Sequence, residues 1–273
     1  MCKSFLFIGG DKRQLYAADI ISRWGSKTSF YGFGEKDCFS YCENYDYFVL
    51  PAPFSKDGTT ISAPFSENKI SVSELNKFNT PKMIIGGNCN SLKESQSAEI
   101  FDLLKCDEYN ILNATATAEG AISLAIANTP CNLRGSNVLV CGFGKIGKIL
   151  AQDLAGMGAN VYVSARKDTD RAYAKIFGYT SLDYSELKFY ADKFDIIFNT
   201  VPAPIIMEEI ITKLNKTCLT IDLASAPGGF DFDALEKLGI KNIWALGLPG
   251  KYSPETSGEI IAEIILKITG GTI

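Results

Sequence analysis

An apolar run that ends in a glycine pattern constrains this chain most. Residues 138–141 read Val-Leu-Val-Cys and lead directly into Gly142-x-Gly144-x-x-Gly147. Apolar side chains then recur at helical spacing as far as residue 157, and Gly158 follows. The pattern predicts a strand, a tight turn and a helix, which together open a dinucleotide-binding unit.

Each glycine has an expected role in such a unit. Gly142 lets the chain turn sharply, Gly144 lets the backbone approach a pyrophosphate, and Gly147 packs the helix against the strand. The first-turn N–H groups and the positive end of the helix dipole then face the anion, so Lys145 and Ile146 are candidate cofactor residues. A second predicted strand over 160–166 completes the βαβ unit.

The end of that second strand indicates which cofactor binds. An NAD site usually ends this strand in Asp or Glu, whereas here the chain reads Ser164-Ala165-Arg166-Lys167. A carboxylate would repel a 2′-phosphate, but the Arg166 guanidinium can pair with it, with help from Ser164 and Lys167. The sequence therefore predicts NADP. The alternative is a solvated strand end, with Asp168 turned towards the ribose.

Composition limits the class of protein. The chain has 273 residues, 46% of them hydrophobic and 21% charged, which fits one or two soluble domains. A net charge of −4 gives no basic footprint for nucleic acid, and no apolar run reaches the length of a membrane helix. The N-terminus lacks the pattern of a signal peptide, so we expect a cytoplasmic protein.

The chain has eight cysteines and no histidine. Without a secretion signal, the cysteines are expected to be reduced thiols. Cys38 and Cys42 form a close pair, but with no histidine they make a poor zinc site, so no metal is expected. Any proton transfer must use Asp, Glu, Lys, Tyr, Cys or water.

Strands and helices alternate along the whole chain. Predicted strands over 4–8, 28–32, 47–50 and 83–85, with a helix over 12–24, indicate a small parallel sheet. The predicted fold is α/β, with two Rossmann-like parallel-sheet domains separated by a cleft. The expected parts are an N-terminal flavodoxin/Rossmann-like substrate domain (1–113), a connecting helix (114–130), an NADP-binding Rossmann domain (131–252) and a C-terminal helix that returns to the first domain (253–273).

The connecting helix is Ala-rich over residues 115–128. Thr117 is the preferred cap of this helix. Glu119 is then either a first-turn carboxylate favoured by the helix dipole or an acid that faces the cleft.

Three later strands each run into an unusual loop. The strands are predicted over 194–198, 218–223 and 242–246, and the loops that follow are rich in Gly and Pro. Such loops line the nicotinamide end of a doubly wound sheet. The cofactor residues expected there are Thr200, Val201, Pro202, Leu223, Ala224 and Ser225. An amphipathic helix is predicted over 254–268.

Taken in order, the motifs resemble those of the A subunit of bacterial dipicolinate synthase. They are Gly9-Gly10-Asp11-x-Arg13-Gln14, Thr117-x-Glu119-Gly120, the glycine turn with Ser164-Ala165-Arg166, Asn199-Thr200-Val201-Pro202, Asp222-Leu223-Ala224-Ser225-x-Pro227-Gly228-Gly229 and Gly247-Leu248-Pro249-Gly250-x-x-x-Pro254-x-Thr256-x-Gly258. Residues 36–80 resemble the family less. The resemblance implies a cytosolic, NADP-dependent enzyme of spore formation that oxidises dihydrodipicolinate to dipicolinate with a flavoprotein-like B subunit. The sequence itself leaves the oligomeric state open, with a homo-oligomer as one alternative.

That reaction needs a hydride acceptor, cations for two carboxylates and one modest base. The candidate substrate residues are Gly10, Asp11, Arg13, Gln14, Thr117, Lys251 and Thr256, of which Arg13 and Lys251 are the cations. Asp11, Glu119 and Asp222 are the candidate bases, and Glu119 is preferred because desolvation in a closing cleft would raise its pKa.

Two other functions remain open at this point. One is a two-domain NADP dehydrogenase that resembles shikimate dehydrogenase. The other is a non-catalytic NADPH-binding subunit that scaffolds its partner.

Overall fold

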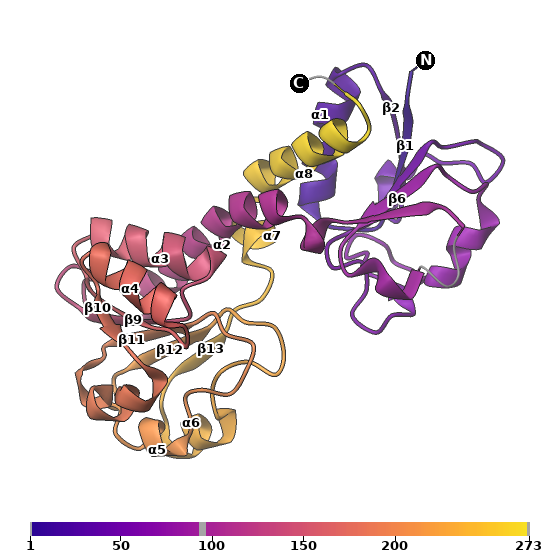
Figure 1. Ribbon diagram of the computed structural model, residues 1–273. Helices are drawn as coiled ribbons and strands as arrows, with labels where there is room; N and C mark the ends of the chain where they lie inside the picture. The colour runs from indigo at the N-terminus through magenta and orange to yellow at the C-terminus, as the bar shows by residue number, and fades with distance from the viewer. Residues whose placement is uncertain (1, 93–96, 272–273) are drawn as a thin grey trace. The chain divides into compact units, whose positions relative to one another are not determined.

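The computed structural model describes residues 2–92 and 97–271, and Figure 1 shows its elements along the chain. The chain divides into two compact units. Unit 1 comprises Met1–Asn113 and Ser253–Ile273, and unit 2 comprises Ala114–Tyr252. Each unit is built on a parallel sheet, so the predicted fold class is confirmed.

The sheet of unit 1 has five strands in the order β2-β1-β3-β6-β7, and every neighbouring pair is parallel. The strands are β1 (Ser4–Ile8), β2 (Lys27–Tyr31), β3 (Tyr47–Val49), β6 (Met83–Gly86) and β7 (Glu99–Asp102). Successive side chains of β1 point to opposite faces, yet Phe5 to Ile8 are all fully buried. Both faces of the sheet are therefore covered, as a parallel sheet requires.

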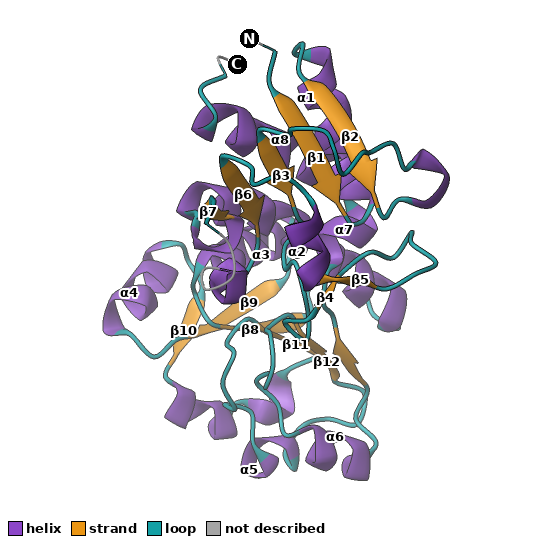
Figure 2. Cartoon of the chain, turned by 90° about the vertical axis from the view of Figure 1, so that its right-hand side faces the viewer, coloured by secondary structure: helices purple, strands orange, loops and turns teal. Residues whose placement is uncertain are grey.

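Helices cover one face of this sheet. They are α1 (Lys12–Arg23) and α8 (Pro254–Ile268), which pack against each other and share a core with Phe5 and Phe7 (Figure 2). Asp11 caps α1 in a capping box with Gln14, which fixes where the helix begins after the turn. α8 has the bounds that the sequence predicts, because Pro254 starts it and its isoleucines recur at helical spacing.

An irregular segment covers the opposite face. It contains the antiparallel pair β4 (Thr60–Ile61) and β5 (Ile70–Ser71). Its aromatic and aliphatic side chains, such as Phe54 and Phe78, pack on Leu6, Ile8 and Phe48 of the sheet. Short 3-10 helices in unit 1 span Gly34–Lys36, Val72–Lys77, Cys89–Leu92 and Leu103–Lys105.

Unit 2 has a six-stranded parallel sheet in the order β10-β9-β8-β11-β12-β13. The strands are β8 (Asn137–Cys141), β9 (Asn160–Ser164), β10 (Thr180–Leu182), β11 (Ile196–Asn199), β12 (Leu219–Asp222) and β13 (Asn242–Trp244). The order reverses between β8 and β11, and ligands of open α/β sheets bind beyond the carboxyl ends of the strands at such a reversal.

Two helical layers enclose the sheet of unit 2. On one face, α2 (Asp107–Asn128) and α3 (Lys145–Gly156) pack on Val138, Val140 and Phe198. On the other face, α5 (Glu208–Ile211) and α6 (Phe232–Leu238) lie together over Leu139 and Ile197 (Figure 2). The remaining helices are α4 (Asp168–Ile176), α7 (Leu248–Tyr252) and the 3-10 segments Tyr184–Phe189 and Ala191–Lys193.

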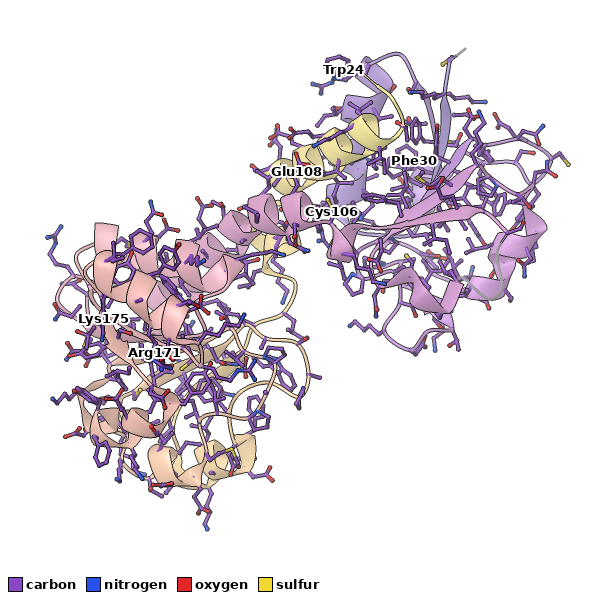
Figure 3. All side chains as sticks on the ribbon, viewed as in Figure 1. Trp24, Phe30, Cys106, Glu108, Arg171 and Lys175 are labelled. Carbon is purple, nitrogen blue, oxygen red and sulfur yellow. The ribbon has the colours of Figure 1, made fainter. Side chains whose placement is uncertain are left out.

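The start of α2 corrects one sequence prediction. The helix begins at Asp107, about two turns before the expected start, with Asp107 and Glu108 in its first turn, where the helix dipole favours acidic side chains. Glu108 also pairs with Lys267 of α8 (Figure 3). Thr117 therefore lies inside the helix and does not cap it, and Glu119 is not a first-turn carboxylate.

The buried face of α8 gives a stability prediction. Ile261 is fully buried in the α1–α8 core, so Ile261→Ala should destabilise the protein by about 2–5 kcal/mol through lost burial and a residual cavity. Ile176 of α4 is 78% exposed, so Ile176→Ala should cost less than about 0.5 kcal/mol. Urea unfolding followed by circular dichroism measures both, and equal midpoints for the two variants would contradict the assigned core.

Candidate active site

The turn after β8 brings three backbone segments into close contact. Gly142 has φ +93°, and a Cβ there would lie 2.4 Å from the Thr200 Oγ1. Thr200 in turn donates from Oγ1 and from its backbone N to the Cys141 carbonyl, each at 2.9 Å. The turn after β11 is thus fixed against the turn after β8, at the reversal point of the sheet.

The other two glycines of the motif differ in what surrounds them. A Cβ at Gly147 would lie 2.1 Å from the Gly142 carbonyl oxygen, so α3 packs on the turn only with glycine at this position. A Cβ at Gly144 would meet no heavy atom within 4 Å, and its φ of −83° suits any residue. The folded chain itself does not need glycine at 144. The open space in front of the α3 N-terminus fits a pyrophosphate that approaches the backbone.

No side chain caps α3, because its N-cap residue is Gly144. The first-turn N–H groups at Lys145 and Ile146 therefore face this open space without a capping side chain. They can hold the phosphates of a dinucleotide, which is the chemistry expected at a helix N-terminus.

At the end of β9, Arg171 of α4 organises the loop (Figure 3). Its Nη1 donates to the carbonyls of Ala165 at 2.7 Å and Arg166 at 3.0 Å, and it pairs with Asp183 at 2.7 Å. Its Nη2 pairs with Asp168, so the carboxylate considered as a ribose ligand is bound to Arg171. Sequence reasoning missed Arg171, although its three-residue spacing from Asp168 is typical of a helical ion pair.

The side chains of this loop differ in exposure. Arg166 and Lys167 are exposed, and within residues 2–92 and 97–271 no carboxylate forms an ion pair with Arg166. Ala165 is buried. Ser164 is fully buried, and this burial does not favour its expected contact with a 2′-phosphate.

The loops after β11 and β12 meet at a buried carboxylate. Asp222 is fully buried and accepts three hydrogen bonds, from the Asn199 Nδ2 at 2.8 Å, the Ala224 N at 2.9 Å and the Gly229 N at 2.7 Å. Leu223 and Ala224 are buried, whereas Pro202 and Ser225 are exposed. Asn199 belongs to a motif seen in the sequence, but its bond to Asp222 depends on the pairing of β11 with β12.

In unit 1, the turn after β1 holds a partly buried ion pair. The Arg13 side chain is 11% exposed, and its Nε and Nη2 bond to the two Asp11 carboxylate oxygens at 2.9 Å each. Burial of the guanidinium lowers the pKa of Arg13, but the bonds to Asp11 outweigh it, so the pKa is raised overall. The buried hydroxyl of Tyr109 also interacts with Arg13.

Gln14 lies beside this pair. Its Oε1 accepts from the Asp11 N at 2.9 Å, which leaves the Nε2 of the side chain buried with no partner. Gly10, with φ +108°, makes room for it, because a Cβ there would lie 2.6 Å from the Gln14 Cδ.

The remaining predicted residues lie on helices. Lys251 is exposed on α7 and Thr256 is exposed on α8. Glu119 is exposed on α2 and lines a hollow of about 840 Å³ with Asp153 of α3 and with Met157, which follows that helix. Burial and the nearby Glu119 raise the pKa of Asp153. Asp153 lies about 12 Å along α3 from its first residue, so Glu119 faces the last turn of that helix and not its N-terminus.

The cysteines are free thiols. Burial raises the pKa of Cys141 and Cys218 to about 12, which keeps both thiols protonated and unreactive. In the described part of the chain, no group of three His, Cys, Asp or Glu side chains could hold a metal ion. The same part contains no helix long and apolar enough to cross a membrane.

Comparison with known proteins first gives the class of unit 2. Residues 114–227 match the family model described as the D-isomer specific 2-hydroxyacid dehydrogenase, NAD binding domain. The strand order, the glycine turn and this match define a nicotinamide dinucleotide-binding domain of the dehydrogenase type. A nicotinamide cofactor, as the sequence predicts, is thereby supported.

The whole chain then identifies the family. Residues 4–100 match the model of the N-terminal domain of the dipicolinate synthase A subunit. The A subunit of dipicolinate synthase from Bacillus subtilis (strain 168) is 32% identical over 278 residues, covering 96% of this chain and 94% of that protein. The chain belongs to the family of dipicolinate synthase A subunits, which confirms the resemblance seen in the motifs.

Two solved structures agree with this assignment. The A subunit of dipicolinate synthase from Bacillus halodurans has a TM-score of 0.90 and 30% identity, covering 99% of this chain and 98% of that one. Its counterpart from Bacillus subtilis has a TM-score of 0.88 and 30% identity, covering 99% and 96%.

The different surroundings of Gly144 and Gly147 give a paired prediction. Gly144→Val should leave the thermal midpoint within a few degrees of the original protein but weaken NADPH binding at least about tenfold, because the side chain would fill the phosphate space. Gly147→Val should destabilise unit 2 by about 1–3 kcal/mol or more, through its clash with the Gly142 carbonyl. Thermal unfolding and NADPH fluorescence titration separate the two effects. Normal NADPH binding by Gly144→Val would rule out this turn as the phosphate site.

Proposed function

We propose that this chain is the A subunit of a dipicolinate synthase that oxidises dihydrodipicolinate to dipicolinate with NADP. The family assignment over 96% of the chain carries the proposal. In this reaction the ring loses a hydride and a proton and becomes aromatic. A nicotinamide bound at the α3 N-terminus side of unit 2 would supply the hydride acceptor for this reaction.

The choice of NADP over NAD is supported by the loop after β9. A guanidinium with no carboxylate partner in the described part of the chain stands where NAD sites usually carry an acidic residue. Arg166 can bond to a 2′-phosphate, and Lys167 adds a second positive charge. The acidic Asp168 is held by Arg171 and does not compete for Arg166.

A dicarboxylate substrate needs cationic and neutral donors. We propose that Arg13 binds one carboxylate through the part of its guanidinium that does not bond to Asp11, and that Gln14 contributes its unpartnered Nε2. Lys251, Thr256 and Thr117 are the further candidates. A buried donor without a partner costs about 1–3 kcal/mol, which a ligand oxygen would recover.

The general base stays a prediction. Glu119 forms no ion pair with any residue of the described ranges, but its carboxylate is exposed beside the last turn of α3. Because the product is aromatic, loss of the ring proton is favourable, and water can accept this proton in place of a protein base. A Glu119→Gln variant with unchanged kcat would favour water.

By family, this protein is proposed to work in the cytoplasm during spore formation, together with a flavoprotein-like B subunit. The deciding assay uses the purified chain with and without the B subunit, with dihydrodipicolinate generated in place. We expect NADPH and dipicolinate to appear together, each followed by its absorbance. NADPH binding without turnover under both conditions would instead favour the non-catalytic scaffold, and turnover of a hydroxy acid such as shikimate would favour the other dehydrogenase.

The loop after β9 yields a prediction about cofactor preference. Arg166→Ala should raise the dissociation constant of NADPH about tenfold and leave that of NADH unchanged, because a charge-assisted bond contributes about 1.5–3 kcal/mol. Lys175→Ala, at the other end of α4 (Figure 3), is the matched control and should change neither value. Calorimetry gives both constants. Equal affinity of the unaltered protein for NADPH and NADH would refute the NADP assignment.

A second prediction concerns Arg13. Arg13→Ala should raise the KM for dihydrodipicolinate at least about tenfold while the NADPH affinity stays the same, since a charge-assisted bond to the substrate is lost. The thermal midpoint should also fall, because Asp11 loses its partner. Arg23→Ala removes an exposed Arg–Asp pair on the same helix and should leave KM unchanged. A lower midpoint with normal KM would show that Arg13 is purely structural.

A further inference from the structure

The strand order of unit 2 divides the dinucleotide between two groups of loops. β9 and β10 lie on one side of β8, and β11, β12 and β13 lie on the other. Arg166, the proposed 2′-phosphate ligand, follows β9. The adenosine half of the cofactor therefore belongs to the β9 side, and the nicotinamide half belongs to the loops after β11 and β12.

Asp222 ends β12 on the nicotinamide side, and both of its carboxylate oxygens are engaged. Oδ1 accepts from the Asn199 Nδ2 and the Ala224 N, and Oδ2 accepts from the Gly229 N. The residue is fully buried. A carboxylate in this state has no exposed oxygen with which to take a proton from a substrate.

Asn199 extends the network to the turn after β11. Its Oδ1 accepts from the Val201 N at 3.0 Å, and its Nδ2 donates to the Val201 carbonyl at 2.9 Å. The side chains of Asn199 and Asp222 thus hold the backbone of two loops in one arrangement.

Gly229 connects a third segment. Its carbonyl accepts from the backbone N of Ile205 and of Ile206, each at 2.9 Å. A Cβ at Gly229 would lie 2.2 Å from the Asn199 Nδ2, so the loop approaches the amide too closely for a side chain. In the same loop, the Ala224 carbonyl accepts a hydrogen bond from the Trp244 indole N–H at 2.9 Å.

We infer that Asp222 is a positioning residue that, through Asn199 and Gly229, holds the loops after β11 and β12 in the arrangement that receives the nicotinamide half of the cofactor. It is not the general base that the sequence suggested. This inference rests on the proposed use of NADP. Asp222 therefore supports binding of the nicotinamide half of the cofactor and does not affect binding of the adenosine half.

The test compares a whole cofactor with its adenosine half. Asp222→Asn keeps the shape but places an amide N–H₂ against N–H donors, so one loop must move. We expect the dissociation constant of NADPH to rise at least tenfold and that of 2′,5′-ADP to change less than twofold. In a Trp24→Phe background, the emission of Trp244 should also shift, because its partner Ala224 lies in the affected loop.

Asp195→Asn is the matched control. Asp195 precedes β11 in the same sheet and accepts from the Asn137 N at 2.8 Å, at the opposite end of the strands. The Asp195→Asn variant should have a lower thermal midpoint. The ratio of its dissociation constants for NADPH and 2′,5′-ADP should be unchanged. Asn199→Ala, which keeps the carboxylate, is measured in parallel in case Asp222→Asn does not fold, and should change the ratio in the same direction by at least threefold.

The outcomes are distinct. An unchanged ratio in Asp222→Asn, or in Asn199→Ala if the first variant is unfolded, overturns the inference. Equal weakening of NADPH and 2′,5′-ADP also overturns it, because the carboxylate would then support the unit as a whole. If the unaltered protein binds neither ligand, the proposed function itself fails. If the ratio changes as expected, the loops and the carboxylate act as one element of the cofactor site.

Discussion

The close approach of α3 to the turn after β8 is the contact on which unit 2 depends. At Gly147 the helix lies so near the Gly142 carbonyl that even a methyl group would overlap it. This contact sets the helix axis so that its first N–H groups open onto the space beside Gly144. The same turn holds Thr200, and through Thr200 the strand β11 that lies across the reversal of the sheet. A local steric contact thus determines where a ligand can bind.

Much of the fold was predictable because buried parallel strands have sequences that are continuous apolar runs. β1, β8 and β11 are of this kind, and α8 has a regular isoleucine spacing and a proline at its start. The start of α2 was not predictable, since the side chains of this helix that pack on the sheet of unit 2 begin only at Ala118. The earlier turns carry polar side chains that look like a loop. Two consecutive acids at Asp107 were the available signal for a helix N-terminus.

The segment that covers the second face of unit 1 has no periodic pattern to read. It packs through irregularly spaced rings, such as Phe39 against Tyr31 and Tyr41 against Phe78. The site residues also divide into those that the sequence pattern could indicate and those that it could not. The proposed role of Arg166 was accessible to sequence reasoning because this residue ends the strand predicted over 160–166. The environment of Asp222 was not, because the donors that surround it come from Asn199 and Gly229, which only the pairing of β11 with β12 brings together.

Arg171 holds the loop after β9 through the carbonyl oxygens of residues 165 and 166, which are backbone atoms that every amino acid provides. The side chain at position 166 is exposed and takes no part in these hydrogen bonds. Under the proposed role of Arg166, cofactor preference and loop stability are therefore set by different residues. On the same proposal, a substitution at position 166 would change the cofactor preference without first making the loop unstable.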